Sequence, residues 1–309
     1  IAAGVDAIRA GADVVLVVGA EVQTTRNAKD GADFLARAAH YKTQRAIDPF
    51  TFPALFAQRT RHVIEETQNT LDDLALASVK AYGNANRNPF AHMRAASMSF
   101  ENASTASASN PHFLANPDLN PWMRISDCSQ VSDGASAVIL ASDAGLERLG
   151  RGKSDCIELL SCIVSASSLA ATPDPLVLGN TQHAANLAYE AAGVSASEID
   201  VAEVHDCFTV VEVLMYEALG FAPSGQGGTL LREGATNVEG RLPVNTGGGL
   251  VGFGHPVGAT GIKQALELWR QFKGVCGDYQ IAGSPNLGLC ANMGGNDRTS
   301  VVSVYRNIG

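Results

Sequence analysis

The chain has 309 residues, of which 46% are hydrophobic and 17% charged, and its formal net charge is -9. This length and composition allow a large buried core and two or more structural units, so we expect a soluble globular protein. The acidic balance and the lack of a long basic run argue against nucleic acid or an anionic membrane as the main partner, and no apolar run is long enough to cross a bilayer.

The cysteines do not form a disulfide framework, because they are scattered through a long chain without a CxxC pair. We therefore expect a reducing compartment. The histidines lack a spacing such as HExxH, and so we expect no metal site. The six cysteines are Cys128, Cys156, Cys162, Cys207, Cys276 and Cys290.

The first residues predict a helix followed by a strand. Ile1, Val5 and Ile8 share one helical face, and Gly11 can end that helix. The apolar run from Asp13 to Val18 then predicts a fully buried strand ending at Gly19. Because the chain starts inside a helix, we expect that earlier residues are missing from it.

The next hundred residues change in composition. From Val22 to about Asn120, Asn, Ser, Thr and Pro are frequent, and short helical patterns at 56–63 and 71–82 are separated by turns. This indicates an irregular inserted domain. Core-like sequence returns at 126–141, where Val138 to Leu140 predict a short buried strand after the Asp133-Gly134 turn.

Polar residues from Arg151 to Asp155 mark a boundary, after which strand and helix patterns alternate. This alternation predicts an α/β architecture, and helix-then-strand order in both parts suggests two similar halves. The expected strands are 157–163, 199–204 and 300–304, and the expected helices are 181–192, 210–219 and 259–272.

The second of these strands, 199–204, is followed directly by His205-Asp206-Cys207-Phe208. Titratable residues at the carboxyl end of a strand are well placed for catalysis in α/β sheets. The structural alternative is that His205 caps the next helix and Cys207 is a buried small hydrophobe.

A second histidine lies in the glycine-rich loop Gly254-His255-Pro256-Val257-Gly258-Ala259-Thr260-Gly261. Pro256 disfavours helical backbone at His255, and the glycines allow close approach of backbone or ligand. The following helix directs its positive end toward this loop, which favours anionic or oxyanion-forming groups. Taken alone, His255 could equally be a structural turn residue.

Gly247, Gly249 and Gly252 formally satisfy the GxGxxG pattern of dinucleotide-binding oxidoreductases. The context does not support that function, because 241–246 is a poor strand and the glycines lead into another loop rather than a helix. We expect them to shape a loop near His255.

The segment Gly254 to Gly261 resembles the GHPxGxxG signature of thiolases, and His205 to Phe208 resembles the HDCF loop of the sterol-carrier-protein type. Weaker similarities lie at 10–21, 132–135 and 217–220, so the resemblance covers nearly the whole chain.

The resemblance implies the α/β thiolase fold, in which two similar βαβαβαββ halves form five layers (αβαβα) with an inserted loop domain. It divides this chain into the remainder of the N-terminal half at 1–21 and 121–152, the loop domain at 22–120 and the C-terminal half at 153–309.

The resemblance also implies roles for His255, His205 and Cys207. His255 activates a thiolate and contacts a thioester oxygen, His205 completes the oxyanion site with it, and Cys207 moves the α-proton as acid/base. An unperturbed thiol, with a pKa of about 8.5, is close enough to working pH for that role. Loop positions near the site are Asp206, Phe208, Gly254, Pro256 and Gly258.

Cys290 is the alternative acid/base, because most thiolases place this cysteine in a C-terminal CxG motif. Here Asn292 stands where that motif has glycine, and so we favour Cys207. The acylated cysteine of the family should lie roughly two helical turns before Ile1 and is not among the six cysteines present.

We therefore expect a thiolase (acyl-CoA C-acyltransferase) in lipid and fatty-acid metabolism, including β-oxidation, that acts on acyl-CoA and acetyl-CoA. Coenzyme A is expected as substrate or product, with no bound cofactor. The alternative is an inactive thiolase-like protein that binds CoA or lipid, or acts as a scaffold. The resemblance further implies a homodimer or tetramer and, in a eukaryote, a peroxisomal or mitochondrial location.

Overall fold

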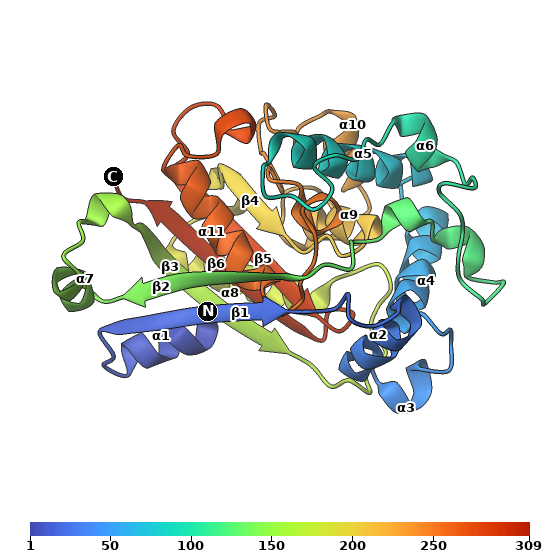
Figure 1. Cartoon of the computed structure of the whole chain (residues 1–309), viewed down its shortest axis with the longest axis horizontal. Helices are drawn as coiled ribbons and strands as arrows, with labels where there is room; N and C mark the ends of the chain where they lie inside the picture. Colours follow the sequence, from blue (N-terminus) through green and yellow to red (C-terminus); the bar gives the residue numbers. More distant parts are fainter.

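The computed structural model describes residues 1–309 as two β-sheets with helices around them (Figure 1). The strands are β1 Val14–Glu21, β2 Gly134–Ala141, β3 Ile157–Ala166, β4 Val201–Val204, β5 Leu287–Gly294 and β6 Thr299–Asn307. The helices are α1 Ala2–Arg9, α2 Ala28–Leu35, α3 Tyr41–Gln44, α4 Thr51–Glu66, α5 Leu71–Arg87, α6 Phe100–Ser104, α7 Asp143–Leu149, α8 Gly179–Ala192, α9 Thr209–Ala218, α10 Gly228–Arg232 and α11 Thr260–Phe272.

The first sheet is the antiparallel pair β1–β2, with Val14 opposite Ala141 and Glu21 opposite Gly134. Helices α2 to α6 lie in the chain between its two strands. In Figure 1 the pair crosses the front of the molecule, with α1 beneath it and α11 behind it.

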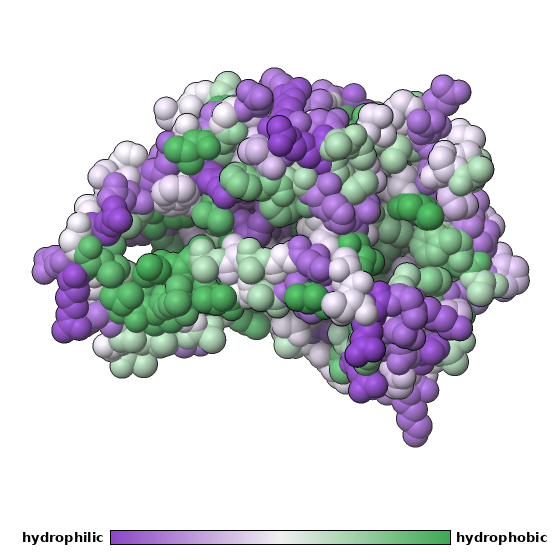
Figure 2. Space-filling model, in the orientation of Figure 1, coloured by the Kyte–Doolittle hydropathy of each residue, from purple (hydrophilic) through white to green (hydrophobic).

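The prediction that 13–18 and 138–140 are fully buried strands is wrong. One face of β1–β2 contacts α1 and α11, and the other face is uncovered, so burial alternates along both strands. Leu16, Val18 and Ile139 are 65%, 60% and 55% exposed, and together with Val14 they form an apolar band (Figure 2). A run of apolar residues does not show how many faces of its strand are covered.

The second sheet has the order β3-β6-β5-β4, in which only β4 and β5 run parallel. Strands occur at the three predicted places, and β5 was not predicted. Helices α8, α9 and α11 also occur at their predicted places. Gly193, with φ 68°, ends α8 in the left-handed conformation that glycine tolerates best.

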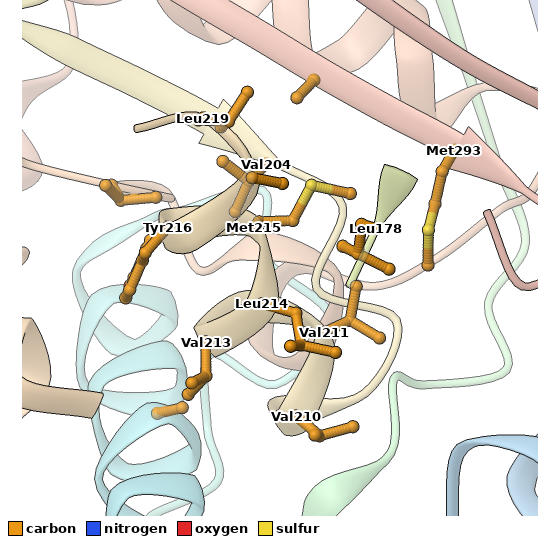
Figure 3. Close-up of a cluster of buried hydrophobic side chains, with 14 of the residues drawn as sticks. Leu178, Val204, Val210, Val211, Val213, Leu214, Met215, Tyr216, Leu219 and Met293 are labelled. Carbon is orange, nitrogen blue, oxygen red and sulfur yellow. The ribbon is translucent and has the colours of Figure 1, made fainter. Parts of the chain in front are cut away.

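Helix α9 lies at the centre of the largest core, a cluster of 39 buried residues. All its residues except Glu217 are buried, which matches its run of apolar side chains from Val210 to Met215. Figure 3 shows Leu178 and Met293 gathered beside its side chains. The segment that precedes α9 therefore rests on a tightly packed support.

None of the helices combines the length and the apolar character that a membrane crossing requires.

Candidate functional site

The loop His205 to Phe208 joins the buried strand β4 to α9. The N–H of Ser129 donates to the carbonyl of Cys207 at 2.9 Å, which fixes the loop to the segment before β2. The Phe208 ring stacks on Phe56 of α4, with centroids 4.6 Å apart. Helix α4 and the segment before β2 thus both hold this loop in place.

The second loop, Gly254 to Ala259, precedes α11 and packs against the first sheet. Gly254 has φ 119°, a conformation that glycine adopts without strain. A Cβ on Gly19 of β1 would lie 2.0 Å from the carbonyl oxygen of Gly258, so only glycine permits this approach. The backbone of β1 therefore sets the position of the loop.

These two loops bring His205 and His255 together. Their rings meet edge to face, with centroids 5.1 Å apart and an interplanar angle of 85°. His205 is 6% exposed, and His255 is partly buried. Burial lowers the pKa of His255 to about 4 and that of His205 well below its usual value, and so both rings are neutral at pH 7.

Thr260, the first residue of α11, orients the His255 ring. Its hydroxyl donates to the carbonyl of Pro256 at 3.2 Å, and its oxygen is 2.7 Å from His255 Nδ1. A hydroxyl has a single proton to donate, so Nδ1 is assigned as the protonated nitrogen and donates to Thr260. The lone pair of Nε2 is then free to accept a proton from a neighbouring group.

His205 does not cap α9. The helix begins after Phe208 without a side-chain cap, and His205 Nδ1 is buried without a hydrogen-bond partner. A buried polar atom without a partner is costly, and such atoms are candidates for ligand contacts. The structural alternative, in which His205 caps α9, is therefore not supported by a hydrogen bond from its side chain to that helix.

Asp206 connects the two loops. Its carboxylate accepts from the N–H of Leu250 at 2.7 Å and from the N–H of Val251 at 3.4 Å. These residues lie in the single π-helical turn Gly249–Phe253, which leads to Gly254. A Cβ on Gly249 would lie 2.2 Å from the Asp206 carboxylate, and so the glycine makes room for this contact. Burial, with Glu212 nearby, raises the pKa of Asp206 to about 7.

Of the glycine-rich segment 247–252, residues 249–252 belong to the π-helical turn Gly249–Phe253, which lies between loops. The helix that a dinucleotide-binding GxGxxG motif would open does not follow it. No group of three or more His, Cys, Asp or Glu side chains is arranged to hold a metal ion.

Cys207 lies in the loop of His205, belongs to the main core cluster and is 8% exposed. Burial raises the pKa of its thiol, with the nearby Asp206 adding to the effect. This differs from the expectation of a thiol close to its ordinary pKa. The thiol keeps its proton in this environment, so it is suited to donate a proton to a carbanion.

Cys290 lies on β5 opposite Glu203 and packs in a different cluster, with Val201, Phe272 and Tyr305. Burial raises the pKa of this thiol well above its ordinary value. Asn292 donates to the side chain of Gln264 at 2.8 Å, on α11. The two candidate cysteines thus occupy separate parts of the interior.

Three polar side chains near His255 were not predicted as site residues. Gln23 Nε2 donates to the carbonyl of His255 at 2.8 Å. Ser132 Oγ accepts from the N–H of His255 at 3.3 Å and lies 2.9 Å from His92 Nδ1. Of these, only Ser132 had a sequence signal, its place before the Asp133-Gly134 turn.

Comparisons with known proteins give consistent results. Residues 162–307 match the family model described as "Thiolase C-terminal domain-like". Over 95% of its length the chain is 33% identical to "Acetyl-CoA acetyltransferase" of Methanothermobacter thermautotrophicus, of which it covers 72%. It is 35% identical to human "Sterol carrier protein 2" over 62% of the chain and 36% of that protein.

Two solved structures share the fold. An "Ltp2-ChsH2(DUF35) aldolase" chain matches the whole chain and 75% of its own length, with a TM-score of 0.76 and 20% identity. A "monomeric SCP2-thiolase like protein type 1" from Mycobacterium smegmatis matches 98% of this chain and 58% of its own, with a TM-score of 0.67 and 18% identity. At such identities the likeness concerns the fold alone.

Proposed function

Because the chain belongs to the thiolase family and is of the sterol-carrier-protein type, we propose that the protein is an acyl-CoA C-acyltransferase. It would cleave a 3-oxoacyl-CoA with CoA, or condense acyl-CoA with acetyl-CoA by Claisen chemistry, in lipid metabolism. The observation that carries the proposal is the edge-to-face pair His205–His255, with Cys207 on the loop of His205.

In the proposed cleavage, His255 Nε2 takes the proton of a cysteine thiol, which we expect before Ile1. The thiolate attacks the 3-oxo carbon, whose oxygen becomes an oxyanion. The bond between C2 and C3 then breaks, and the acyl group remains on sulfur while acetyl-CoA leaves as its enolate. Free CoA afterwards attacks the acyl-enzyme and releases acyl-CoA.

His205 and His255 would stabilise the enolate oxygen, since donors placed in advance around a developing charge lower a barrier most. Cys207 would protonate the enolate carbon, in agreement with a buried thiol that holds its proton. Cys290 is the alternative for this step. CoA is a substrate or product, and we propose no resident cofactor.

Thiolysis of acetoacetyl-CoA by the protein carrying the upstream cysteine tests this function. We expect CoA-dependent loss of substrate, and a His255→Asn variant with native circular dichroism should lose at least about 100-fold in kcat. Binding of acetoacetyl-CoA without turnover would instead support the alternative, an inactive CoA-binding or scaffolding protein.

The family resemblance also supports a homodimer or tetramer and, in a eukaryote, a peroxisomal or mitochondrial location. We propose both on that ground alone. Sedimentation and localisation of the tagged protein would test them separately.

A further inference from the structure

A cavity of about 350 Å³ lies near α3 and α4, bordered by the segment after β3 and the turn between β5 and β6. None of its 15 lining residues is aspartate or glutamate. The basic side chains among them are His40, Arg59, Arg61 and His62. His62 is already paired with Glu66 at 2.6 Å, and so the two arginines are the charged groups that favour an anion in this cavity.

Arg59 is the most buried of these four residues, with 1% of its surface exposed. Its Nε donates to Asn296 Oδ1 at 2.5 Å, and its Nη1 donates to the carbonyls of Asp174, Pro175 and Val177 at 2.9 to 3.1 Å. Its Nη2 is buried without a partner. The two N–H groups of Nη2 are therefore unused.

No carboxylate forms an ion pair with Arg59. Nearby Asp297 is engaged elsewhere, because its carboxylate accepts from the N–H groups of Asn180 and Thr181 and from the hydroxyl of Ser300. Burial lowers the pKa of Arg59 to about 10, and so the group is still charged at pH 7. The charges of Asp297 and Asp174 stabilise the guanidinium at longer range, whereas a bound oxyanion would give it a direct partner.

The cavity lies close to the candidate site along α4. Phe56, which stacks on Phe208, is one helical turn before Arg59. On the other side of Arg59, Val177 precedes Leu178, which belongs to the same core cluster as Cys207 and Phe208. The cavity and the candidate site thus adjoin the same helix and the same core cluster, and this is the ground for assigning the oxyanion and the reacting thioester to one ligand.

We propose that this cavity binds an oxyanion, carboxylate or phosphate, carried by the CoA thioester at a distance from its reacting carbonyl. The assignment of the thioester rests on the proposed function, whereas the oxyanion preference rests on Arg59. A carboxylate can accept two parallel hydrogen bonds from a guanidinium fork, and Nη2 has the free donors for this. The source is either a carboxylate on the acyl group or a phosphate of CoA.

Calorimetric titration of the full chain with adipoyl-CoA, hexanoyl-CoA and CoA tests the proposal, because the two acyl chains are equal in length and differ in a terminal carboxylate. If the acyl group carries the oxyanion, adipoyl-CoA binds about tenfold more tightly than hexanoyl-CoA. If CoA carries it, the three ligands bind alike, and all three lose about tenfold in the variants below.

Arg59→Met removes the charge but also the contacts to 174–177, so it could unfold the protein. Gln58→Glu leaves Arg59 in place and adds a competing carboxylate at a lining position. Arg148→Met, on the distant helix α7, is the matched control and should bind every ligand like the wild type.

Wild-type affinities in Gln58→Glu and in folded Arg59→Met, for all three ligands, would overturn the proposal. The same preference for adipoyl-CoA in a protein without thiolysis activity would overturn the proposed function and support the cavity assignment. The two inferences thus fail separately.

Discussion

Asp206 accepts a hydrogen bond from the N–H of Leu250 at 2.7 Å, and through it the loop after β4 holds the turn that leads to His255. This contact helps to fix the positions of the two histidine-bearing loops relative to each other. This contact also explains why a buried carboxyl follows His205: it satisfies backbone donors that an apolar residue would leave without partners.

Replacing Asp206 tests this connection. Asp206→Ala leaves the N–H groups of Leu250 and Val251 buried without an acceptor, and we expect a loss of about 1–3 kcal/mol in the free energy of unfolding. Asp206→Asn retains one acceptor oxygen and should lose clearly less. Urea unfolding at pH 7 measures both, and equal losses would show that the backbone contacts are unimportant.

Thr260 should affect activity through the orientation of His255. Thr260→Val removes the acceptor of His255 Nδ1–H, so the ring can rotate or exchange its tautomer, and we expect kcat for thiolysis to fall about tenfold or more. Thr260→Ser keeps the hydroxyl and should restore most of the rate. KM should change little in both, whereas Thr260→Val should also lose about 1–3 kcal/mol in the free energy of unfolding because Nδ1–H has no other acceptor. A Ser variant as slow as the Val variant would contradict this role.

His255 should make the protein sensitive to acid. Its folded pKa of about 4 lies below the ordinary value of 6.5, so the unfolded chain binds a proton that the folded protein resists. This contribution to stability is complete above pH 6.5 and is lost as the pH falls toward 4, by about 3 kcal/mol. Unfolding curves at pH 7, 5.5 and 4.5 should show a smaller acid loss in His255→Gln than in the wild type. Equal losses of unfolding free energy in the wild type and in His255→Gln would contradict this role of His255.

The two cysteines should separate in an exchange experiment. In the protein carrying the upstream cysteine, Cys207→Ala should abolish exchange of the acetyl-CoA α-proton with deuterated water, whereas Cys290→Ala should retain it. Proton NMR of the acetyl signal measures the exchange. Loss of exchange only in Cys290→Ala would assign the acid/base role to Cys290.

Gly19 should not tolerate a side chain. The Cβ of Gly19→Ala would lie 2.0 Å from the backbone oxygen of Gly258, and we expect a loss of about 1–3 kcal/mol in unfolding free energy. Gly31→Ala is the matched control, because nothing lies within 4 Å of that Cβ in helix α2. It should leave the protein unchanged or more stable, by up to about 1 kcal/mol. Similar effects at both positions would argue against the close approach.

Short motifs and helical patterns predicted much of this structure, because their signals are local. The loops of His205 and His255 are recognisable from adjacent residues, and α4 and α5 extend the patterns found at 56–63 and 71–82. Strand β5 was missed although its apolar residues Leu287, Leu289, Ala291 and Met293 alternate, because Gly288 and Asn292 between them are of residue types that strands disfavour.

Contacts between distant residues left no such signal. Gln23 reaches His255 and Arg59 reaches Asn296 only after folding, and neither glutamine nor arginine marks a site in a helical or polar pattern. The uncovered face of β1–β2 was unpredictable for the same reason, since it depends on which elements cover the strands.

The π-helical turn Gly249–Phe253 has a consequence for variation in length. A π-turn contains one more residue than an α-turn, and such turns often occur at functional sites. Deleting a single residue from it would wind the backbone into an α-turn and rotate everything that follows, including the His255 ring. The number of residues between Leu250 and His255 should therefore tolerate change less readily than the residue type at position 251. Natural insertions or deletions should fall outside this stretch.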